Sequence, residues 1–402
     1  MKHKIVNIFL LVAIAKGSLA QTGKVGINTS TPLAMLHVKD SSVLFTGSAT
    51  LPIIPGNPPA SGPGTRMMWY SDKAAFRAGF VKNTLWDRDS IGTYSIAVGY
   101  NTKAGSDASI AMGSSTNASG NASTAMGIGT IASAFGSTAM GNNTTASEHS
   151  STAMGNGTTA NGQNSTAIGI NTTASGTNSI AMGDNAVASG IVSIALGLNT
   201  RASGFNATAM GYETSANGYF STAIGFSTNA RGFATTAIGM FNDSISAISQ
   251  TLPTFLTPLF IVGNGDNNTT RRNAMVVLKN GNVGIGDNAP AVSMQLEGAV
   301  AYNRHSYTAT TTVFNINVGN QTYLRIGSDG TGTAATRNVT LSDGLTIGQI
   351  LIIHCHGNPF KLKEADLNLE LQGNADLDMS QDDTLSLIWD GAEWVELHRS
   401  DN

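Results

Sequence analysis

A short motif that returns every fourteen residues dominates the middle of this sequence. The first of its eleven copies is S-I-A-V-G at residues 95–99 and the last is T-T-A-I-G at residues 235–239, with no insertion between copies. Every copy has alanine in its third and glycine in its fifth position. Such strict periodicity predicts a repeat architecture. A second alanine fills the tenth position of all ten complete repeats: Ala104, Ala118, Ala132, Ala146, Ala160, Ala174, Ala188, Ala202, Ala216 and Ala230.

The repeat length restricts the fold of each unit. Fourteen residues cannot hold two helices and their turns, and Thr, Ser, Asn and Gly are poor helix formers. Two short strands and two tight turns fit, with glycine expected to supply positive φ at the turns. Each repeat then forms one coil of a flattened β-solenoid, in which each strand pairs with its copy one coil on. The period and the lack of a recurring Asp or Leu exclude calcium-binding nonapeptide rolls and leucine-rich repeats.

Side-chain alternation predicts which positions are buried. The third-position alanine should face the tenth-position alanine across a thin interior, while the second and fourth positions share the opposite face. Those two positions are also largely apolar, and a strand that is apolar on both faces is usually buried on both. A second layer must therefore cover the outer face, most simply another copy of the chain. Six methionines occupy the fourth position: Met112, Met126, Met140, Met154, Met182 and Met210.

Rough energies also predict an obligate homo-oligomer. Burying an alanine methyl group contributes about 0.8 kcal/mol. Fixing the backbone of one residue costs about 1–2 kcal/mol. An alanine-filled roll is therefore not expected to be stable alone. Burying the Met and Ile side chains between subunits would add about 1.5–3 kcal/mol for each.

The repeat resembles the YadA-like head of trimeric autotransporter adhesins, whose units read S-x-A-x-G…A-x-G. The resemblance covers residues 95–241 and implies a left-handed parallel β-roll, a homotrimer and a role in adhesion. The remaining sequence departs from that family. We find no heptad-repeat stalk or neck motif in it and expect no C-terminal barrel anchor.

The N-terminus reads as a secretory signal. Lys2 and Lys4 precede an apolar run from Ile5 to Ala15, and Ser18-Leu19-Ala20 forms a small-residue cleavage site. A membrane anchor is less favoured, because a span needs about 20 apolar residues. We therefore expect an exported protein at the cell surface, associated with the outer membrane or extracellular, with no membrane-spanning segment after signal cleavage. The net charge of −3 gives no reason to expect a nucleic-acid partner.

Two further motifs frame the repeats. Val25-Gly26-Ile27 followed by Pro32 matches Val283-Gly284-Ile285 followed by Pro290, and such V-G-I-x4-P units resemble modules of phage tail fibres and bacterial surface proteins. The sequence thus predicts an all-β protein with small β modules at both ends of the roll. The expected parts are a signal peptide (1–20), an N-terminal β module with a Pro/Gly linker (21–64), a capping module (65–94), the roll (95–241), a connecting segment with the second V-G-I module (242–299) and a C-terminal antiparallel β domain (300–402).

Few residues suggest a binding site. Phe205, Tyr219 and Phe233 share one repeat position and should stack about 4.8 Å apart as a ligand-binding column. Alternatively, these rings close the C-terminal end of the trimer or pack on residues 242–262. Tyr212 and Phe226 should form a second column.

Metal, cofactor and disulfide chemistry find little support in the sequence. His354 and His356 would share one strand face, but two imidazoles without a third ligand favour an ordinary strand over a metal site. We expect no cofactor. Cys355 is the single cysteine, which excludes an intrachain disulfide.

These features predict an exported, fibre-like adhesin that binds an extracellular protein or glycan through a stiff trimeric head. The alternative is a phage-type tail-fibre or receptor-binding structural protein, which shares the flanking modules but would lack a signal peptide. A polysaccharide-degrading solenoid enzyme would need clustered carboxylates. The carboxylates of the roll never share a repeat position, so we expect no enzyme. The charged residues of the roll are Lys103, Asp107, Glu148, Asp184, Arg201, Glu213 and Arg231.

Overall fold

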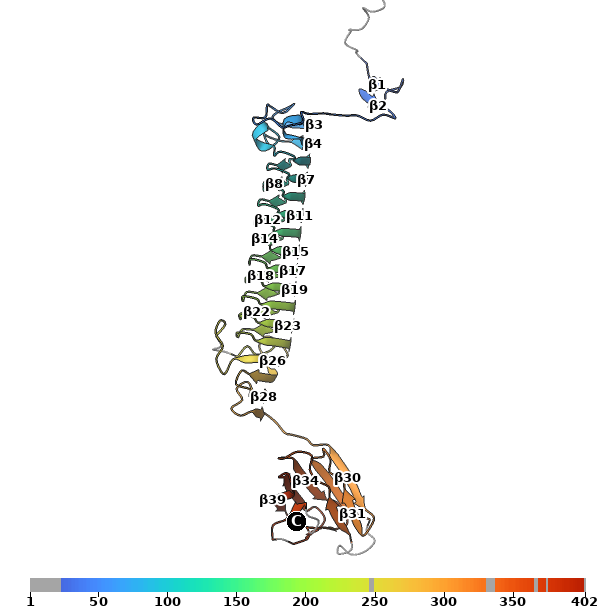
Figure 1. Cartoon of the computed structure of the whole chain (residues 1–402), viewed down its shortest axis with the longest axis vertical. Helices are drawn as coiled ribbons and strands as arrows, with labels where there is room; N and C mark the ends of the chain where they lie inside the picture. Colours follow the sequence, from blue (N-terminus) through green and yellow to red (C-terminus); the bar gives the residue numbers. More distant parts are fainter. Residues whose placement is uncertain (1–22, 246–248, 330–336, 365–367, 374, 401–402) are drawn as a thin grey trace, which may run out of the picture. The chain divides into compact units, whose positions relative to one another are not determined.

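The computed structural model describes residues 23–245, 249–329, 337–364, 368–373 and 375–400, so the expected signal peptide lies outside the described residues. The described part is all-β, and its only helices are two 3₁₀ turns, η1 (Ser71–Lys73) and η2 (Arg88–Ser90) (Figure 1). None of its helices is long and apolar enough to cross a membrane. The chain divides into two compact units, residues 1–297 and 298–402.

The first unit contains a roll of stacked coils, which confirms the predicted β-solenoid. Each coil has a five-residue broad strand and a two-residue narrow strand, and each strand pairs in parallel with its copy fourteen residues on, as Ala153 does with Ala167. The broad strands are β5 (Ile96–Tyr100), β7 (Ile110–Ser114), β9 (Thr124–Ile128), β11 (Thr138–Asn142), β13 (Thr152–Asn156), β15 (Thr166–Ile170), β17 (Ile180–Asp184), β19 (Ile194–Leu198), β21 (Thr208–Tyr212), β23 (Thr222–Phe226) and β25 (Thr236–Met240). The narrow strands are β6 (Lys103–Ala104), β8 (Asn117–Ala118), β10 (Ile131–Ala132), β12 (Thr145–Ala146), β14 (Thr159–Ala160), β16 (Thr173–Ala174), β18 (Val187–Ala188), β20 (Arg201–Ala202), β22 (Ser215–Ala216) and β24 (Asn229–Ala230).

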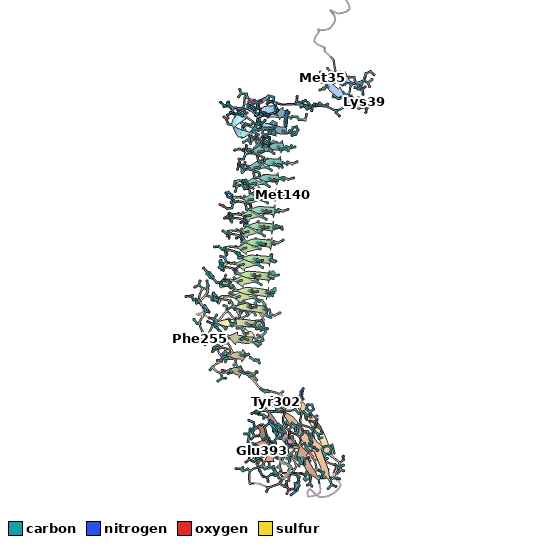
Figure 2. The ribbon with its side chains drawn as sticks, in the orientation of Figure 1. Met35, Lys39, Met140, Phe255, Tyr302 and Glu393 are labelled. Carbon is teal, nitrogen blue, oxygen red and sulfur yellow. The ribbon has the colours of Figure 1, made fainter. Side chains whose placement is uncertain are left out.

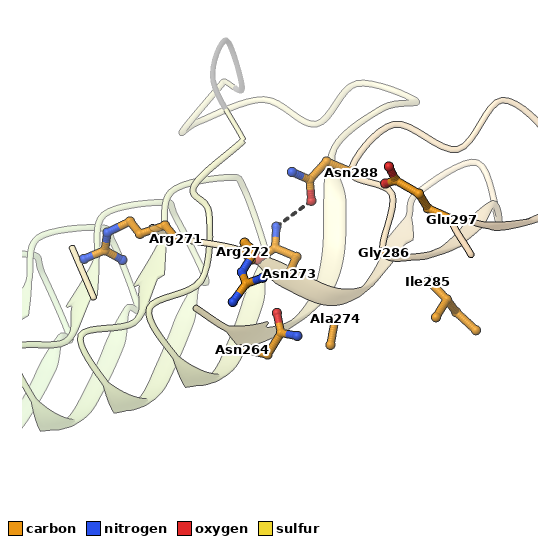
Figure 3. A pocket seen from close by; sticks show the side chains of 9 residues that line it. All are labelled: Asn264, Arg271, Arg272, Asn273, Ala274, Ile285, Gly286, Asn288 and Glu297. Carbon is orange, nitrogen blue, oxygen red and sulfur yellow. Dashed lines mark hydrogen bonds between the residues drawn. The ribbon is translucent and has the colours of Figure 1, made fainter. Parts of the chain in front are cut away.

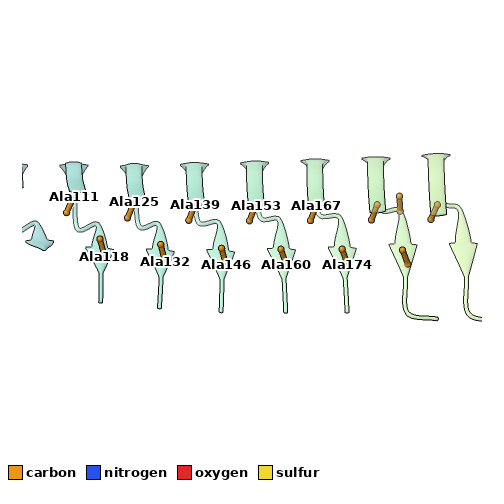
Figure 4. Close-up of a cluster of buried hydrophobic side chains, with 14 of the residues drawn as sticks. Ala111, Ala118, Ala125, Ala132, Ala139, Ala146, Ala153, Ala160, Ala167 and Ala174 are labelled. Atoms are coloured by element: carbon orange, nitrogen blue, oxygen red, sulfur yellow. The ribbon is translucent and has the colours of Figure 1, made fainter. Parts of the chain in front are cut away.

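The interior of the roll is built from small side chains. The two alanine rows face each other in Figure 4, and Ala160 and Ala167 are both 0% exposed. Buried hydroxyls accompany them, because threonine fills most eighth positions and serine most first positions. The Ser151 hydroxyl donates to the Glu148 carbonyl at 2.6 Å. The Thr158 hydroxyl, by contrast, has no hydrogen-bond partner among the described residues. Such a group typically costs about 1–3 kcal/mol, so the interior alone stabilises the roll poorly.

Glycine plays the predicted part at a minority of the turns, as at Gly129, Gly136 and Gly157, where φ is 61–64°. The seventh and fourteenth positions have positive φ, but most of them are not glycine: φ is 49° at Asn171, 58° at Val192 and 58° at Phe220. The recurring glycine lies within the broad strand instead. Gly169 has φ of 126°, and a Cβ there would lie 1.9 Å from the carbonyl oxygen of Gly183. The fifth position therefore requires glycine because successive backbones approach closely there.

A hairpin closes the N-terminal end of the roll. β3 (Gly64–Tyr70) pairs antiparallel with β4 (Ala75–Val81), and β4 pairs in parallel with β5. This register places Arg77 beside Ala97, in line with the interior alanines. Arg77 is 0% exposed and donates to the carbonyls of Ser95 at 3.0 Å and Ala104 at 2.9 Å. Burial lowers the pKa of the Arg77 guanidinium to about 10. Trp86, also fully buried, donates to the Thr102 carbonyl at 2.8 Å.

The stacked broad sheet continues past the last repeat. After residue 241 the chain leaves the roll and returns as β26 (Pro258–Asn264), which pairs in parallel with β25 and antiparallel with β27 (Asn273–Leu278). Ile261 lies in register with Ala237 and is 2% exposed. The Asn242 amide closes the narrow sheet by bonding the Asn229 backbone through both its oxygen (2.7 Å) and its nitrogen (2.9 Å).

The two V-G-I units have the same local structure. β1 (Val25–Ile27) pairs in parallel with β2 (Leu36–Val38), and β28 (Val283–Ile285) pairs in the same register with β29 (Met294–Leu296). Both units need their glycine, since a Cβ on Gly26 or Gly284 would lie 2.3 or 2.2 Å from a carbonyl oxygen three residues on. β28 also pairs antiparallel with β27, which joins the second unit to the end of the broad sheet.

The second unit contains two sheets whose side chains share one buried core that includes Leu324, Ile353, Phe360 and Trp394. The six-stranded sheet has the order β30 (Arg304–Ala309), β32 (Tyr323–Ser328), β34 (Ile350–Cys355), β38 (Thr384–Trp389), β39 (Trp394–Ser400) and β36 (Leu369–Glu370). The four-stranded sheet has the order β31 (Val313–Ile316), β33 (Asn338–Leu341), β35 (Phe360–Leu362) and β37 (Leu377–Met379).

The predicted antiparallel pairing of this region is wrong for its first half. β30, β32 and β34 pair in parallel, as do β31, β33 and β35. The reason is that consecutive strands alternate between the two sheets, so neighbours within a sheet run in the same direction. The expected hairpin around Asp390-Gly391 is present, because β38 and β39 pair antiparallel.

Candidate binding surface

The outward side of the broad strands, hereafter the broad face, is an apolar surface that the single chain leaves open. Its apolar side chains come from the fourth position of every coil and from many second and sixth positions, which elsewhere hold Thr, Ser, Asn or, at one position, Asp184. Met112 is 38% exposed, Met182 40% and Ile224 42%. Figure 2 labels Met140, which belongs to this row. On this face, half-buried apolar side chains from successive coils adjoin and form one continuous row. Such a row is typical of an interaction surface.

The broad face extends beyond the repeats at both ends. On β4, Phe76 and Ala78 lie in register with Ile96 and Val98, which fill the second and fourth positions of the first coil. On β26, Phe260 and Val262 take the same places beyond β25. The apolar row therefore continues from the N-terminal hairpin to the strands beyond the last repeat.

A chain segment already covers part of this face. Val43, Leu44 and Phe45 line an open groove of about 870 Å³ together with Trp69 and Phe76. Because Phe76 belongs to the broad face, the apolar segment of residues 43–45 lies at the N-terminal end of that face. The covering is incomplete, since Phe45 remains 70% exposed.

The predicted ligand-binding aromatics come together, but not as a regular column. The ring centroids of Phe205 and Tyr219 are 5.9 Å apart and tilted by 49°. Phe220 packs edge-on at 5.4 Å from both Phe205 and Phe233 and so lies between them. The even 4.8 Å column expected for Phe205, Tyr219 and Phe233 is therefore wrong. Sequence reasoning missed Phe220, although two adjacent aromatic residues in a turn could have indicated it. We call Phe205, Tyr219, Phe220 and Phe233 the aromatic cluster.

The segment after the roll returns to the aromatic cluster. The Tyr219 amide donates to the Gln250 carbonyl at 2.9 Å, and the Phe233 amide donates to the Ser249 carbonyl at 3.2 Å. This agrees with the alternative that the rings pack on residues 242–262. Part of the cluster stays accessible, since Tyr219 is 40% and Phe220 46% exposed. Phe255 on the same returning segment is 78% exposed (Figure 2).

The second predicted column is confirmed. The rings of Tyr212 and Phe226 are 4.8 Å apart and lie 5° from parallel. Phe241 meets Phe226 edge-on at 5.1 Å, and the Arg271 guanidinium lies 5.8 Å from the Phe241 ring. Tyr212 and Phe226 occupy the sixth position, so this column belongs to the broad face.

A polar pocket of about 440 Å³ lies beyond the last coil (Figure 3). Its polar groups are largely engaged with one another. Arg271 donates to the carbonyls of Ser227 (2.8 Å) and Asn242 (3.1 Å), and Asn273 donates to Asn288 at 2.8 Å. These bonds tie the returning strands to the roll, which makes the pocket part of the end closure.

The histidine pair forms a small polar cluster on the second unit. The rings of His354 and His356 are 6.2 Å apart. The Tyr323 hydroxyl lies 2.9 Å from His354 Nδ1, and an Asp382 carboxylate oxygen lies 3.6 Å from His354 Nε2. Within the described ranges, no group of three or more His, Cys, Asp or Glu residues could hold a metal ion. Burial raises the pKa of the Cys355 thiol to about 12.

The carboxylates of the roll lie apart from one another. Asp107 accepts a hydrogen bond from the Thr93 amide at 3.1 Å. Glu213 accepts one from the Ser227 hydroxyl at 3.0 Å. They stand at the thirteenth and seventh positions of different coils, so neither has the partner carboxylate that general acid and base catalysis of glycoside hydrolysis needs.

Comparison with known families identifies two segments of the chain, and no curated protein matches it. The second unit matches the phage depolymerase C-terminal β-sandwich domain over residues 305–395. The roll carries YadA head domain repeats, which match at residues 90–116, 104–130, 118–144, 132–158, 146–172, 160–186, 174–200 and 202–228.

Proposed function

We propose that this protein is an exported, fibre-like surface adhesin that presents its roll as a stiff trimeric head. The observation that carries the proposal is a roll of YadA head repeats whose broad face is largely apolar and open along the repeats. Chains with such heads are trimeric, and a trimer would cover this face. Full burial of a large apolar side chain contributes about 1.5–3 kcal/mol, so covering the exposed part contributes roughly 1 kcal/mol at each coil.

Light scattering on residues 21–402 tests the assembly. A trimer predicts three times the mass of one chain. A folded monomer at micromolar concentration would refute the trimeric head, because the broad face would then have no covering layer.

We propose that the aromatic cluster contacts the extracellular ligand, a protein or a glycan. Tyr219 and Phe220 are its accessible members, and aromatic rings offer large apolar area at a low cost in conformational entropy. A panel of immobilised glycans and matrix proteins should retain the protein, and the pair Tyr219→Ser with Phe220→Ser should weaken retention at least tenfold.

A matched control keeps that test specific. Phe135 is 57% exposed and occupies the same repeat position as Tyr219 in an earlier coil, so Phe135→Ser removes an equivalent ring away from the cluster. Equal losses in Phe135→Ser and in the double variant would contradict a localised site.

A phage-type tail-fibre or receptor-binding structural protein is the second candidate. The match of residues 305–395 to a phage depolymerase domain favours it. The mature N-terminus separates the two functions. Export predicts a chain that begins at Gln21 in the surface or extracellular fraction, whereas a fibre assembled in the cytoplasm would keep residues 1–20.

We propose no enzyme activity for the roll, because its carboxylates are isolated. Incubation of the whole protein with bacterial polysaccharides, followed by measurement of new reducing ends, tests this for both units. Released oligosaccharides would overturn the proposal, because they would show that some part of the protein cleaves polysaccharides.

A further inference from the structure

The second unit is acidic but contains two unpaired arginines. Residues 298–402 carry six Lys and Arg against thirteen Asp and Glu, a difference of −7. Four of the six cations form ion pairs, namely Arg337 with Asp329, Lys361 with Asp378, Lys363 with Asp376 and Arg399 with Glu396. The side chains of Arg304 and Arg325 have no hydrogen bond or ion pair with any other described residue.

The two unpaired arginines occupy diagonal positions of neighbouring strands on the outward face of the six-stranded sheet. Arg304 on β30 is in register with Tyr323 on β32, and Arg325 on β32 is in register with His354 on β34. Arg325 is in register with Ser306, two residues from Arg304, and diagonal neighbours of this kind are about 7–8 Å apart, within reach of long side chains. Leu324 is buried in the core, so strand alternation directs its neighbours Tyr323 and Arg325 outward.

The neighbouring groups organise this face for hydrogen bonding. Tyr323 and His354 are joined by the 2.9 Å contact between the hydroxyl and Nδ1. The Asp382 carboxylate, 3.6 Å from the other ring nitrogen, holds the imidazole from the opposite side. Arg325 is half-buried next to this pair. A partly desolvated guanidinium without a carboxylate partner favours binding of an external anion, because guanidinium matches carboxylate and sulfate groups with two parallel hydrogen bonds.

We propose that Arg304, Tyr323, Arg325 and His354 form a binding site for an acidic polysaccharide, with the arginines on its carboxylate or sulfate groups and the Tyr323 ring against a sugar. The negative charge of the second unit limits how densely charged an anionic ligand can be. A net −7 repels polymers with a dense charge such as nucleic acid, whereas a glycan with one anionic group per few sugars can place that group on the arginine pair. The site is separate from the aromatic cluster of the roll, so it stands or falls independently of the proposed adhesive head.

Calorimetry on the whole protein tests the site with four named probes. Hyaluronan oligosaccharides carry carboxylates only, a sparsely sulfated dextran with less than one sulfate per sugar carries sulfates only, unmodified dextran is neutral, and a single-stranded oligonucleotide represents a dense polyanion. We expect hyaluronan oligosaccharides or the sparsely sulfated dextran to bind, with affinity that falls as salt rises from about 50 to about 300 mM, and unmodified dextran not to bind. Arg304→Gln with Arg325→Gln should weaken that binding at least tenfold.

Lys361→Gln with Lys363→Gln is the matched control, since it removes the same charge from the same unit at ion-paired positions on the other sheet. It should leave the affinity within about twofold. Arg304→Lys with Arg325→Lys keeps the charge but removes the guanidinium fork, and it should bind with intermediate affinity. Equal loss in the Lys361 and Lys363 variant, equal affinity for neutral dextran, tightest binding of the oligonucleotide, or no binding of any probe would each overturn the proposal.

Discussion

At the scale of single residues, alanine and glycine are required in the roll for different reasons. The alanines are needed because the interior is too thin for larger side chains, as the complete burial of Ala160 and Ala167 shows. The fifth-position glycines are needed because one coil's backbone touches the next, as the Gly169 geometry shows. The turns tolerate many residues, including Val192 at positive φ, because the pairing of each coil with its neighbours holds them in that conformation.

The alanine row makes a direct prediction about stability. Ala167→Leu should lower the melting temperature by about 5 °C or more, since overpacking costs about 1–3 kcal/mol in each chain. Thr159→Val, whose side chain points out of the roll, should change it little. Thermal unfolding at a fixed protein concentration measures both. If leucine is tolerated at position 167, the inside and outside faces have been assigned incorrectly.

At the scale of elements, the two ends of the roll matter more than any single coil. A solenoid exposes unpaired backbone groups and an open core at each end. β4 covers the first coil and inserts Arg77 in line with the alanines, and β26 covers the last coil with Ile261. The guanidinium of Arg77 gives the Ser95 and Ala104 carbonyls a second hydrogen bond, in addition to those from the Phe76 and Gly92 amides.

Removing the Arg77 side chain should loosen the N-terminal coils. Arg77→Ala leaves a cavity and removes the guanidinium's hydrogen bonds to Phe76, Ser95 and Ala104, for an expected loss of about 2–4 kcal/mol in local stability. Hydrogen exchange should rise in residues 95–118 and stay unchanged near residues 160–190, because repeat proteins open locally. Arg88→Ala is the control, since Arg88 is 46% exposed and pairs only with exposed Asp89. Uniform exchange along the roll would contradict a capping role.

An acid-sensitive contact is expected in the last strand of the second unit. The hydrogen bond from Arg399, followed by one from the Gln372 amide, lowers the pKa of Glu396 below its usual 4.5. The unfolded chain thus binds a proton at higher pH than the folded chain, so this contact stabilises the fold above about pH 4.5 and is lost as the pH falls through the lowered pKa.

Glu396→Gln should therefore destabilise the second unit by about 1–3 kcal/mol at pH 7, and the difference from wild type should shrink below about pH 4. Hydrogen exchange in residues 384–400 reports the effect. Glu393→Gln serves as the control, because no ion pair or side-chain hydrogen bond joins the Glu393 carboxylate to another described residue. A difference that stays constant from pH 7 to pH 3 would argue against the charged contact.

At the scale of the whole molecule, the broad face is the dominant surface feature. It runs through every coil and continues onto β4 and β26, while the interior offers only alanine, serine and threonine. The stability of the roll should accordingly depend on association. The melting temperature should rise with protein concentration, as it does when folding and assembly are linked.

A charge on the broad face should break the assembly. Met154→Asp would place a carboxylate in the centre of the apolar row, where burial without a partner costs several kcal/mol. We expect loss of the proposed trimer and a large drop in melting temperature, read by light scattering and circular dichroism. Asn161→Asp, on an exposed turn of the same coil, should leave both unchanged. A Met154→Asp variant that keeps the wild-type mass would exclude this face as the interface.

The sequence by itself determined the roll, because each residue of a coil pairs with the residue fourteen positions away. The fourteen-residue period of the sequence therefore specifies the strand register. The alanine interior, the apolar broad face and the Tyr212–Phe226 column all followed from periodicity and alternation. Tertiary structure decided the parts that do not repeat. Arg77 enters the roll, Phe220 separates Phe205 from Phe233, and β30, β32 and β34 pair in parallel rather than antiparallel. Buried and exposed side chains alternate in the same way in parallel and antiparallel strands, so the sequence pattern does not indicate strand direction. The burial of Arg77 depends on carbonyl groups that are distant in the sequence. Both features were therefore decided by long-range strand pairing.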